Sequence, residues 1–206
     1  MAINDGLTTT CTNIQSSGGI QTVFIREWNS TGSPDQIATL GTGTITSIAD
    51  SGGSTSTWGV YETKIETPVL SVTGASVGNA NTYECSLTFN LPQLDLARRN
   101  SITDLQGKCL QVMMLDTNGT YFVIGISGTL TGGDGGLDLA VASHIGTRPQ
   151  TFARLSAVEG GTGAAFSDET GLNVTLTCTQ YELPRTYVAA GAAVSINAAG
   201  LVATVS

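Results

Sequence analysis

Two segments of the chain alternate strictly between apolar and polar residues, and this period of two constrains the fold more than any other feature. The segments are residues 83–89 and 172–179. Successive side chains of a β-strand point to opposite faces, so each segment predicts a strand with one buried and one solvated face. The expected buried sides hold Tyr83, Cys85, Leu87 and Phe89 in the first segment, and Leu172, Val174, Leu176 and Cys178 in the second.

Further strands are predicted where β-branched and aromatic residues lie between turn residues. Residues 20–25 predict a strand, residues 37–57 predict short strands and a loop, and residues 58–70 predict a strand in which Pro68 marks the end or an edge position. Residues 108–115 and 120–126 flank the segment 116–119, where Asn118-Gly119 supplies the positive φ angles of a tight hairpin turn. Residues 194–197 and 201–205 predict a C-terminal hairpin around a turn at 198–200.

One helix is predicted, over residues 91–106. Pro92 suits its first turn, and Gly107 follows it, where a left-handed residue ends many helices. Apolar residues recur at helical spacing on one side, and Arg98 and Arg99 face elsewhere, which predicts a helix packed on a sheet. The residues of this apolar side are Leu94, Ala97, Ile102 and Leu105.

The expected fold class is therefore mainly β, a β-sandwich or barrel-like domain with one flanking helix at about 91–106 and long loops. The length of 206 residues suits one domain. Residues 1–19 are polar and predict an N-terminal arm, residues 20–185 the β-rich domain, and residues 186–206 a C-terminal hairpin or arm. A glycine-rich stretch at 127–163 reads as a loop insertion that contacts other subunits, and part of it, 137–143 or 151–158, is expected to pair as strand or to pack on a neighbour.

The charge balance argues against a protein that binds nucleic acid tightly. The formal net charge is −8, with 8 basic and 16 acidic residues, and Arg98 with Arg99 is the only adjacent pair of cations. Affinity for phosphates needs clustered cations. The N-terminus has no secretory signal pattern, and the uncharged residues 186–206 are interrupted by Gly, Ser, Thr and Asn, so we expect no membrane segment and synthesis in the cytosol.

No catalytic, cofactor-binding or metal-binding site is predicted. The single histidine, His144, lies in a Gly/Ser-rich loop without a nucleophile motif. Asp134 and Asp138 miss the spacing of a repeated calcium motif, and the adjacent Asp168 and Glu169 suit a turn. No two cysteines have the close spacing of zinc ligands, and we expect reduced, mostly buried thiols, although four cysteines allow three disulfide pairings. The cysteines are Cys11, Cys85, Cys109 and Cys178.

Residues 91–125 and 162–184, together with a Gly-Gly-Ile at 18–20, resemble structural proteins of tailed bacteriophages. The pattern D-x-N-G-x-Y-x-x-x-G matches five residues of the hairpin segment, and T-G-x-x-x-x-D-x-x-G matches four residues further on. The matching residues are Asp116, Asn118, Gly119, Tyr121 and Gly125 in the first pattern, and Thr162, Gly163, Asp168 and Gly171 in the second. The resemblance covers about residues 18–28 and 89–185.

The resemblance implies a tail tube subunit: a β-sandwich with one flanking helix, whose copies form hexameric rings that stack into a conduit for DNA. The implied partners are further copies of the chain, other tail or neck proteins of the virion, and DNA that passes without tight or sequence-specific binding. No enzymatic activity, cofactor or membrane is implied, and the expected location is the virion tail after synthesis in the host cytoplasm. The alternatives are a head decoration or neck ring protein of the same virion, or a carbohydrate-binding adhesin. An adhesin needs exposed aromatic residues, whereas Trp28 and Trp58 are expected in the core.

Overall fold

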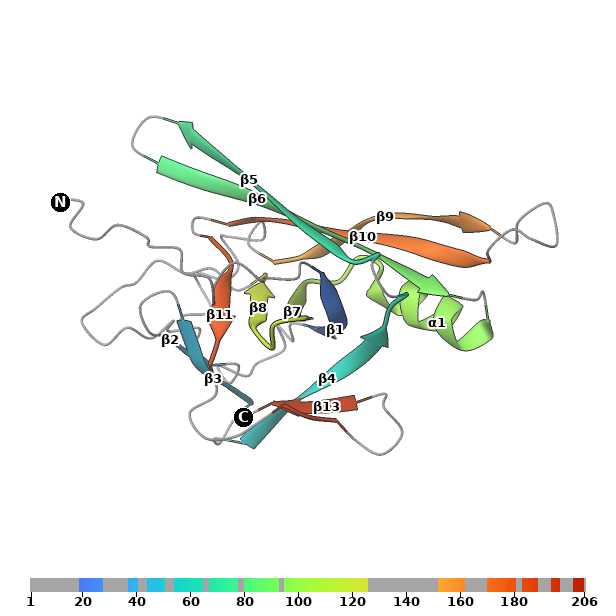
Figure 1. Cartoon of the computed structure of the whole chain (residues 1–206), viewed down its shortest axis with the longest axis horizontal. Helices are drawn as coiled ribbons and strands as arrows, with labels where there is room; N and C mark the ends of the chain where they lie inside the picture. The colour runs from blue at the N-terminus through green and yellow to red at the C-terminus, as the bar shows by residue number, and fades with distance from the viewer. Residues whose placement is uncertain are drawn as a thin grey trace, which may run out of the picture.

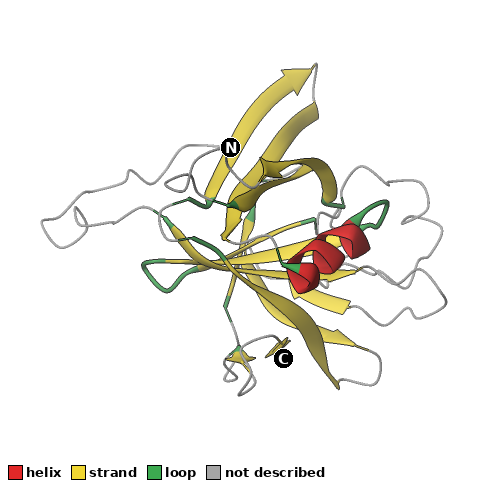
Figure 2. Ribbon diagram, turned by 90° about the vertical axis from the view of Figure 1, so that its right-hand side faces the viewer, coloured by secondary structure: helices red, strands yellow, loops and turns green. Residues whose placement is uncertain are grey.

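The structure is a computed structural model. Its described residues contain thirteen strands, which form two sheets, and one helix. It describes residues 19–27, 37–40, 44–50, 54–64, 67–77, 80–92, 95–125, 152–161, 170–180, 183–188, 194–196 and 202–205. The predicted fold class is confirmed: the chain is mainly β with one helix, in a sandwich-like arrangement of two sheets (Figures 1 and 2).

The larger sheet has nine strands in the order β12-β13-β4-β1-β7-β8-β11-β3-β2. It curls far enough for β3 to pair with β4 as well as with β2 and β11. Its pairs are antiparallel, apart from β11 with β3. The strands are β1 (Ile20–Glu27), β2 (Ile37–Leu40), β3 (Thr44–Asp50), β4 (Ser54–Glu62), β7 (Leu110–Asp116), β8 (Tyr121–Ile124), β11 (Arg185–Tyr187), β12 (Ser195–Ile196) and β13 (Val202–Val205).

The smaller sheet has four antiparallel strands in the order β5-β6-β10-β9. Its strands are β5 (Val69–Val77), β6 (Ala80–Pro92), β9 (Arg154–Gly161) and β10 (Gly171–Gln180). The two central strands contain the two alternating segments of the sequence, and their predicted burial is confirmed: Cys85, Leu87, Phe89, Val174, Leu176 and Cys178 are buried, and Tyr83 and Leu172 are partly buried. Figure 1 shows this sheet lying across one face of the larger sheet.

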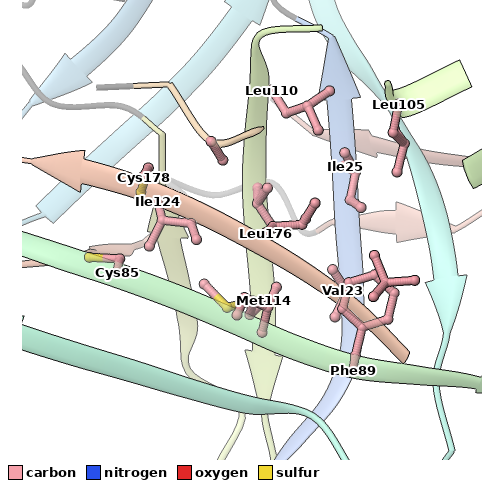
Figure 3. Packing of buried hydrophobic residues seen from close by; sticks show 14 of the residues in the cluster. Val23, Ile25, Cys85, Phe89, Leu105, Leu110, Met114, Ile124, Leu176 and Cys178 are labelled. Carbon is pink, nitrogen blue, oxygen red and sulfur yellow. The ribbon is translucent and has the colours of Figure 1, made fainter. Parts of the chain in front are cut away.

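The main core fills the space between the sheets (Figure 3). One side comes from β6 and β10, and the other from β1, β7 and β8, with Ile102 and Leu105 of the helix closing one end. A second cluster, which includes Phe24, Trp58 and Met113, lies on the opposite face of the larger sheet. Strands β1 and β7 are therefore buried on both faces, which explains why residues 112–115 are continuously apolar rather than alternating.

The helix α1 (Leu96–Leu105) is shorter than predicted and begins later. Pro92 is the last residue of β6 and not part of a first helical turn, because β6 continues its pairing with β10 as far as Gly171. The helix begins after Asp95, whose carboxylate accepts a hydrogen bond of 2.7 Å from the backbone N–H of Arg98. Ala97, predicted on the apolar side, is exposed, and Leu94 lies outside the described residues.

The predicted strand over residues 58–70 is wrong in its extent. Strand β4 ends at Glu62, and β5 begins at Val69, directly after Pro68. Between them the chain passes from the larger sheet to the smaller one, and Thr67 donates from both its N–H and its hydroxyl to the carbonyl of Lys64. Pro68 thus precedes a strand instead of ending one.

Three other predicted elements are confirmed. The β7–β8 hairpin is joined by residues 117–120, in which Gly119 has φ +79° and its N–H donates to the carbonyl of Asp116. Strand β9 covers most of the predicted segment 151–158, whereas segment 137–143 lies outside the described residues. Strands β12 and β13 form the C-terminal hairpin, and β13 pairs with β4.

Candidate assembly surface

The residues weighed for chemistry at the sequence level do not form a site in the described part of the chain. His144, Asp134, Asp138, Asp168 and Glu169 all lie outside it. Within the described residues, no group of three His, Cys, Asp or Glu side chains could hold one metal ion. Among those same residues, no helix is long and apolar enough to cross a membrane.

The hairpin residues of the phage-like pattern have structural roles. The carboxylate of Asp116 accepts hydrogen bonds from the N–H of Asn118 at 3.2 Å, from its amide at 2.9 Å and from the hydroxyl of Thr117 at 2.9 Å. Desolvation acts to raise the pKa of Asp116, but these hydrogen bonds outweigh it and lower the pKa below its ordinary value. Tyr121 packs against Phe24 and Tyr187, with ring centroids 6.2 and 6.3 Å apart.

Two glycines of the patterns, Gly125 and Gly171, lie where backbones approach closely. Gly125 has φ +82°, and a Cβ placed on it would lie 2.5 Å from the carbonyl oxygen of Leu110. A Cβ on Gly171 would lie 2.8 Å from the carbonyl oxygen of Leu91. The remaining residues of the second pattern, Thr162, Gly163 and Asp168, lie outside the described residues, as does Gly18.

The face of the smaller sheet that points away from the main core is polar and poor in charge; we call it the outer face. Two pairs of side chains hydrogen-bond across its central strands: the hydroxyls of Thr88 and Thr175 at 3.2 Å, and the Asn90 amide to Asn173 at 2.8 Å. By register and alternation, the outer face holds Val69, Ser71 and Thr73 of β5, Glu84, Ser86, Thr88 and Asn90 of β6, Asn173, Thr175, Thr177 and Thr179 of β10, and Arg154, Ala157 and Glu159 of β9.

Both edges of the smaller sheet are free of further strand pairing among the described strands. Strand β5 pairs only with β6, and β9 only with β10. Strand β5 has no charged residue and no internal proline, and Val69 on it is 59% exposed. Strand β9 is blunted by a bulge at Ser156 and by two charged residues, Arg154 and Glu159. Edges with unpaired backbone groups are places where another strand can add.

One end of the β5–β6 hairpin extends beyond the sandwich, as Figure 1 shows at the upper left. The consecutive residues 73–76 of β5 are all exposed, so both faces of the strand are solvated there. No charged residue occurs between Val69 and Glu84. A solvated, uncharged strand pair of this kind is typical of a surface that contacts another chain.

Sequence reasoning missed this edge, because it placed Pro68 at the end or at an edge position of a strand over residues 58–70 and made no prediction for residues 71–82. A signal was present in the sequence. Leu70 and Val72 alternate with Ser71 and Thr73, and the uncharged stretch continues to Tyr83. The two inward residues pack against the main core, as such a pattern predicts.

The buried Trp58 and Arg26 contact each other. Trp58 is 0% exposed, which confirms its predicted core position, and the guanidinium of Arg26 stacks over its ring at 5.0 Å from the centroid. Arg26 also donates to the side chain of Gln111 at 2.6 Å. Trp28, the other tryptophan, lies outside the described residues.

Comparisons of the chain with models of protein families, with curated proteins and with solved structures found no match.

Proposed function

We propose that the chain is a virion structural protein of a tailed bacteriophage, a tail tube subunit. In this proposal its copies join through the edges of the smaller sheet into hexameric rings, and the rings stack into a conduit for DNA. The observation that carries the proposal is the four-stranded sheet with two free edges, β5 on one side and β9 on the other. One copy's β5 can add to the next copy's β9 beyond the bulge, at residues 157–161, and such a heterologous contact closes into a ring when the rotation between copies permits it.

The outer face of the smaller sheet supports the conduit part of the proposal. It holds one cation, Arg154, against the carboxylates of Glu84 and Glu159. Its other polar side chains are hydroxyls and amides, which carry no charge and so cannot neutralise phosphates. With a net charge of −8 on each subunit, a wall of this composition lets DNA pass without holding it.

The proposal includes the virion tail as the location, synthesis in the host cytoplasm, and contact with other tail or neck proteins at the ends of the tube. It includes no enzymatic step, no cofactor and no membrane. The buried position of Trp58 gives no support to the adhesin alternative, which needs exposed aromatic rings.

Assembly of the purified protein tests the proposal. Negative-stain microscopy and sedimentation of concentrated protein should show rings or tubes. Ser71→Lys on β5 should abolish them, because β5 has no charged residue of its own and a lysine on an edge strand hinders the addition of another strand. Ala97→Lys is the matched control, since Ala97 is also exposed but lies on the helix.

Two outcomes would refute edge pairing: wild-type protein that stays monomeric at high concentration, or an edge variant that assembles as well as the helix variant. A virion map in which the protein decorates the head, or forms a neck ring, would replace the tube with the corresponding alternative. Binding to a glycan array at micromolar strength would favour the adhesin.

A further inference from the structure

Cys85 and Cys178 lie directly opposite each other on β6 and β10, the two central strands of the smaller sheet. Directly opposite residues of an antiparallel pair point to the same face. Both side chains enter the main core, where Cys85 is 0% and Cys178 is 5% exposed. Figure 3 shows the two sulfur atoms on the core side of the sheet, near Ile124.

This register meets the backbone requirement of a disulfide. Directly opposite residues have Cα atoms about 4.5 or 5.5 Å apart, depending on the kind of pair, and disulfides span Cα separations of about 4.4–6.8 Å. The Cβ atoms of such pairs are about 4.5–5.5 Å apart, against about 3.8 Å in a disulfide. The bridge therefore needs the strands to approach by roughly 1 Å, with no change of register.

The two thiols interact with each other, and Cys178 also contacts the side chain of Gln180. A hydrogen bond with Cys178 lowers the pKa of Cys85, against the opposing effects of burial and of Glu84. The same hydrogen bond and burial raise the pKa of Cys178. The side-chain oxygen of Gln180 accepts from the sulfur of Cys178 at 3.8 Å and from the N–H of Gly125 at 3.0 Å, which holds Cys178 in place.

We propose that Cys85 and Cys178 are an oxidation site that forms a disulfide across the centre of the smaller sheet when the folded chain meets a peroxide. The sulfur of one cysteine attacks one peroxide oxygen, the O–O bond breaks, the other oxygen departs as water, and the attacking cysteine becomes a sulfenic acid. The sulfur of the second cysteine then attacks that sulfur, the S–O bond breaks, and the hydroxyl departs as water with the proton of the second thiol. Two thiols and one hydrogen peroxide give one disulfide and two waters, so sulfur is oxidised and peroxide oxygen is reduced. This inference does not depend on the proposed function.

The bridge would connect positions about 93 residues apart, and long loops gain the most from closure because the unfolded chain loses more freedom. The oxidised chain should therefore unfold at a temperature roughly 10 °C higher than the reduced chain. Cys109 offers no such partner in the described structure: it is partly exposed, lies outside the strands, and accepts from Arg154 at 3.8 Å.

The test is to treat the folded full-length chain with hydrogen peroxide, alkylate the remaining thiols after denaturation, and map the unreduced peptides by mass spectrometry. The expected product links the peptides of Cys85 and Cys178 and loses two hydrogens. Cys109→Ala and Cys11→Ala should keep this link, whereas Cys85→Ala and Cys178→Ala should remove it. In the Cys11→Ala/Cys109→Ala background, thermal unfolding with and without dithiothreitol measures the stabilisation.

The wild-type peptide map decides the question even if a cysteine variant fails to fold. Recovery of Cys85 and Cys178 as separately alkylated residues, or as sulfinic acids, overturns the proposal. A disulfide that uses Cys11 or Cys109 instead also overturns it. If the Cys85–Cys178 disulfide is found but its reduction leaves the unfolding temperature unchanged, the proposed stabilisation by the disulfide is overturned.

Discussion

Gly125→Ala should destabilise the protein by far more than an ordinary glycine substitution. Gly125 has φ +82°, and an added Cβ would lie 2.5 Å from the Leu110 oxygen and 3.0 Å from the Ala153 nitrogen. Those two residues form a reciprocal bridge, with N–H···O bonds of 2.8 and 2.9 Å. The left-handed backbone costs alanine about 1–2 kcal/mol. Displacing the bridge costs about 1 kcal/mol for each weakened bond.

The sum is about 3–4 kcal/mol, which corresponds to a fall of roughly 6–16 °C in the unfolding midpoint of a chain of this size. Gly119→Ala is the matched control, because Gly119 has φ +79° but no atom within 4 Å of its added Cβ. In Gly119→Ala the free energy of unfolding should fall only by the cost of the left-handed backbone, about 1–2 kcal/mol. Thermal and urea unfolding of both variants measure the difference. If the two variants unfold within about 0.5 kcal/mol of each other, the steric argument is wrong.

Three further predictions use other parts of the molecule. Leu176→Ala, at a fully buried core position, should lower the free energy of unfolding by about 3 kcal/mol in urea titration, whereas Thr177→Ala on the outer face should change it little. The lowered pKa of Asp116 adds stability that is complete above the ordinary carboxyl pKa and is lost as the pH falls through the lowered value of the folded state. Asp116→Asn should therefore flatten the acid side of the curve of unfolding free energy against pH, below about pH 4. An unchanged curve would contradict this. The purified protein should not be retained on immobilised DNA at low salt, and retention that high salt reverses would count against the conduit.

The sequence predicted the parts of the fold in which one local pattern has one physical cause. Strands β6 and β10 were recognisable because each buries a single face, so Leu87 and Leu176 alternate with polar neighbours. The start of the helix could not be recognised in the same way, because Pro92 suits both the first turn of a helix and the end of a strand. Only its pairing with Gly171 decides between the two. The N-terminal cap at Asp95 was the signal that went unused.

The free edges were beyond the reach of sequence patterns for a different reason. Whether a strand is central or at an edge depends on which distant segment lies beside it, and residues 69–77 and 154–161 are joined only through β6 and β10. The pattern of apolar residues does not distinguish an edge strand from a central one, because an edge strand also buries one face. Leu70 of β5 and Leu155 of β9 both pack against the main core. The pairing is a property of the assembled sheet and not of any one segment.

The energetics of edge pairing limit what the smaller sheet can do alone. Strand β5 has 9 residues, and a full antiparallel ladder would give it at most about one hydrogen bond per residue. At about 1 kcal/mol net for each bond, the ladder supplies about 9 kcal/mol. Fixing two chains relative to each other costs about 4–15 kcal/mol, so the ladder alone leaves an association that is weak or absent. A stable ring then needs contacts outside the sheet, and the glycine-rich segment 127–163, predicted from the sequence to contact other subunits, is where the proposal expects them.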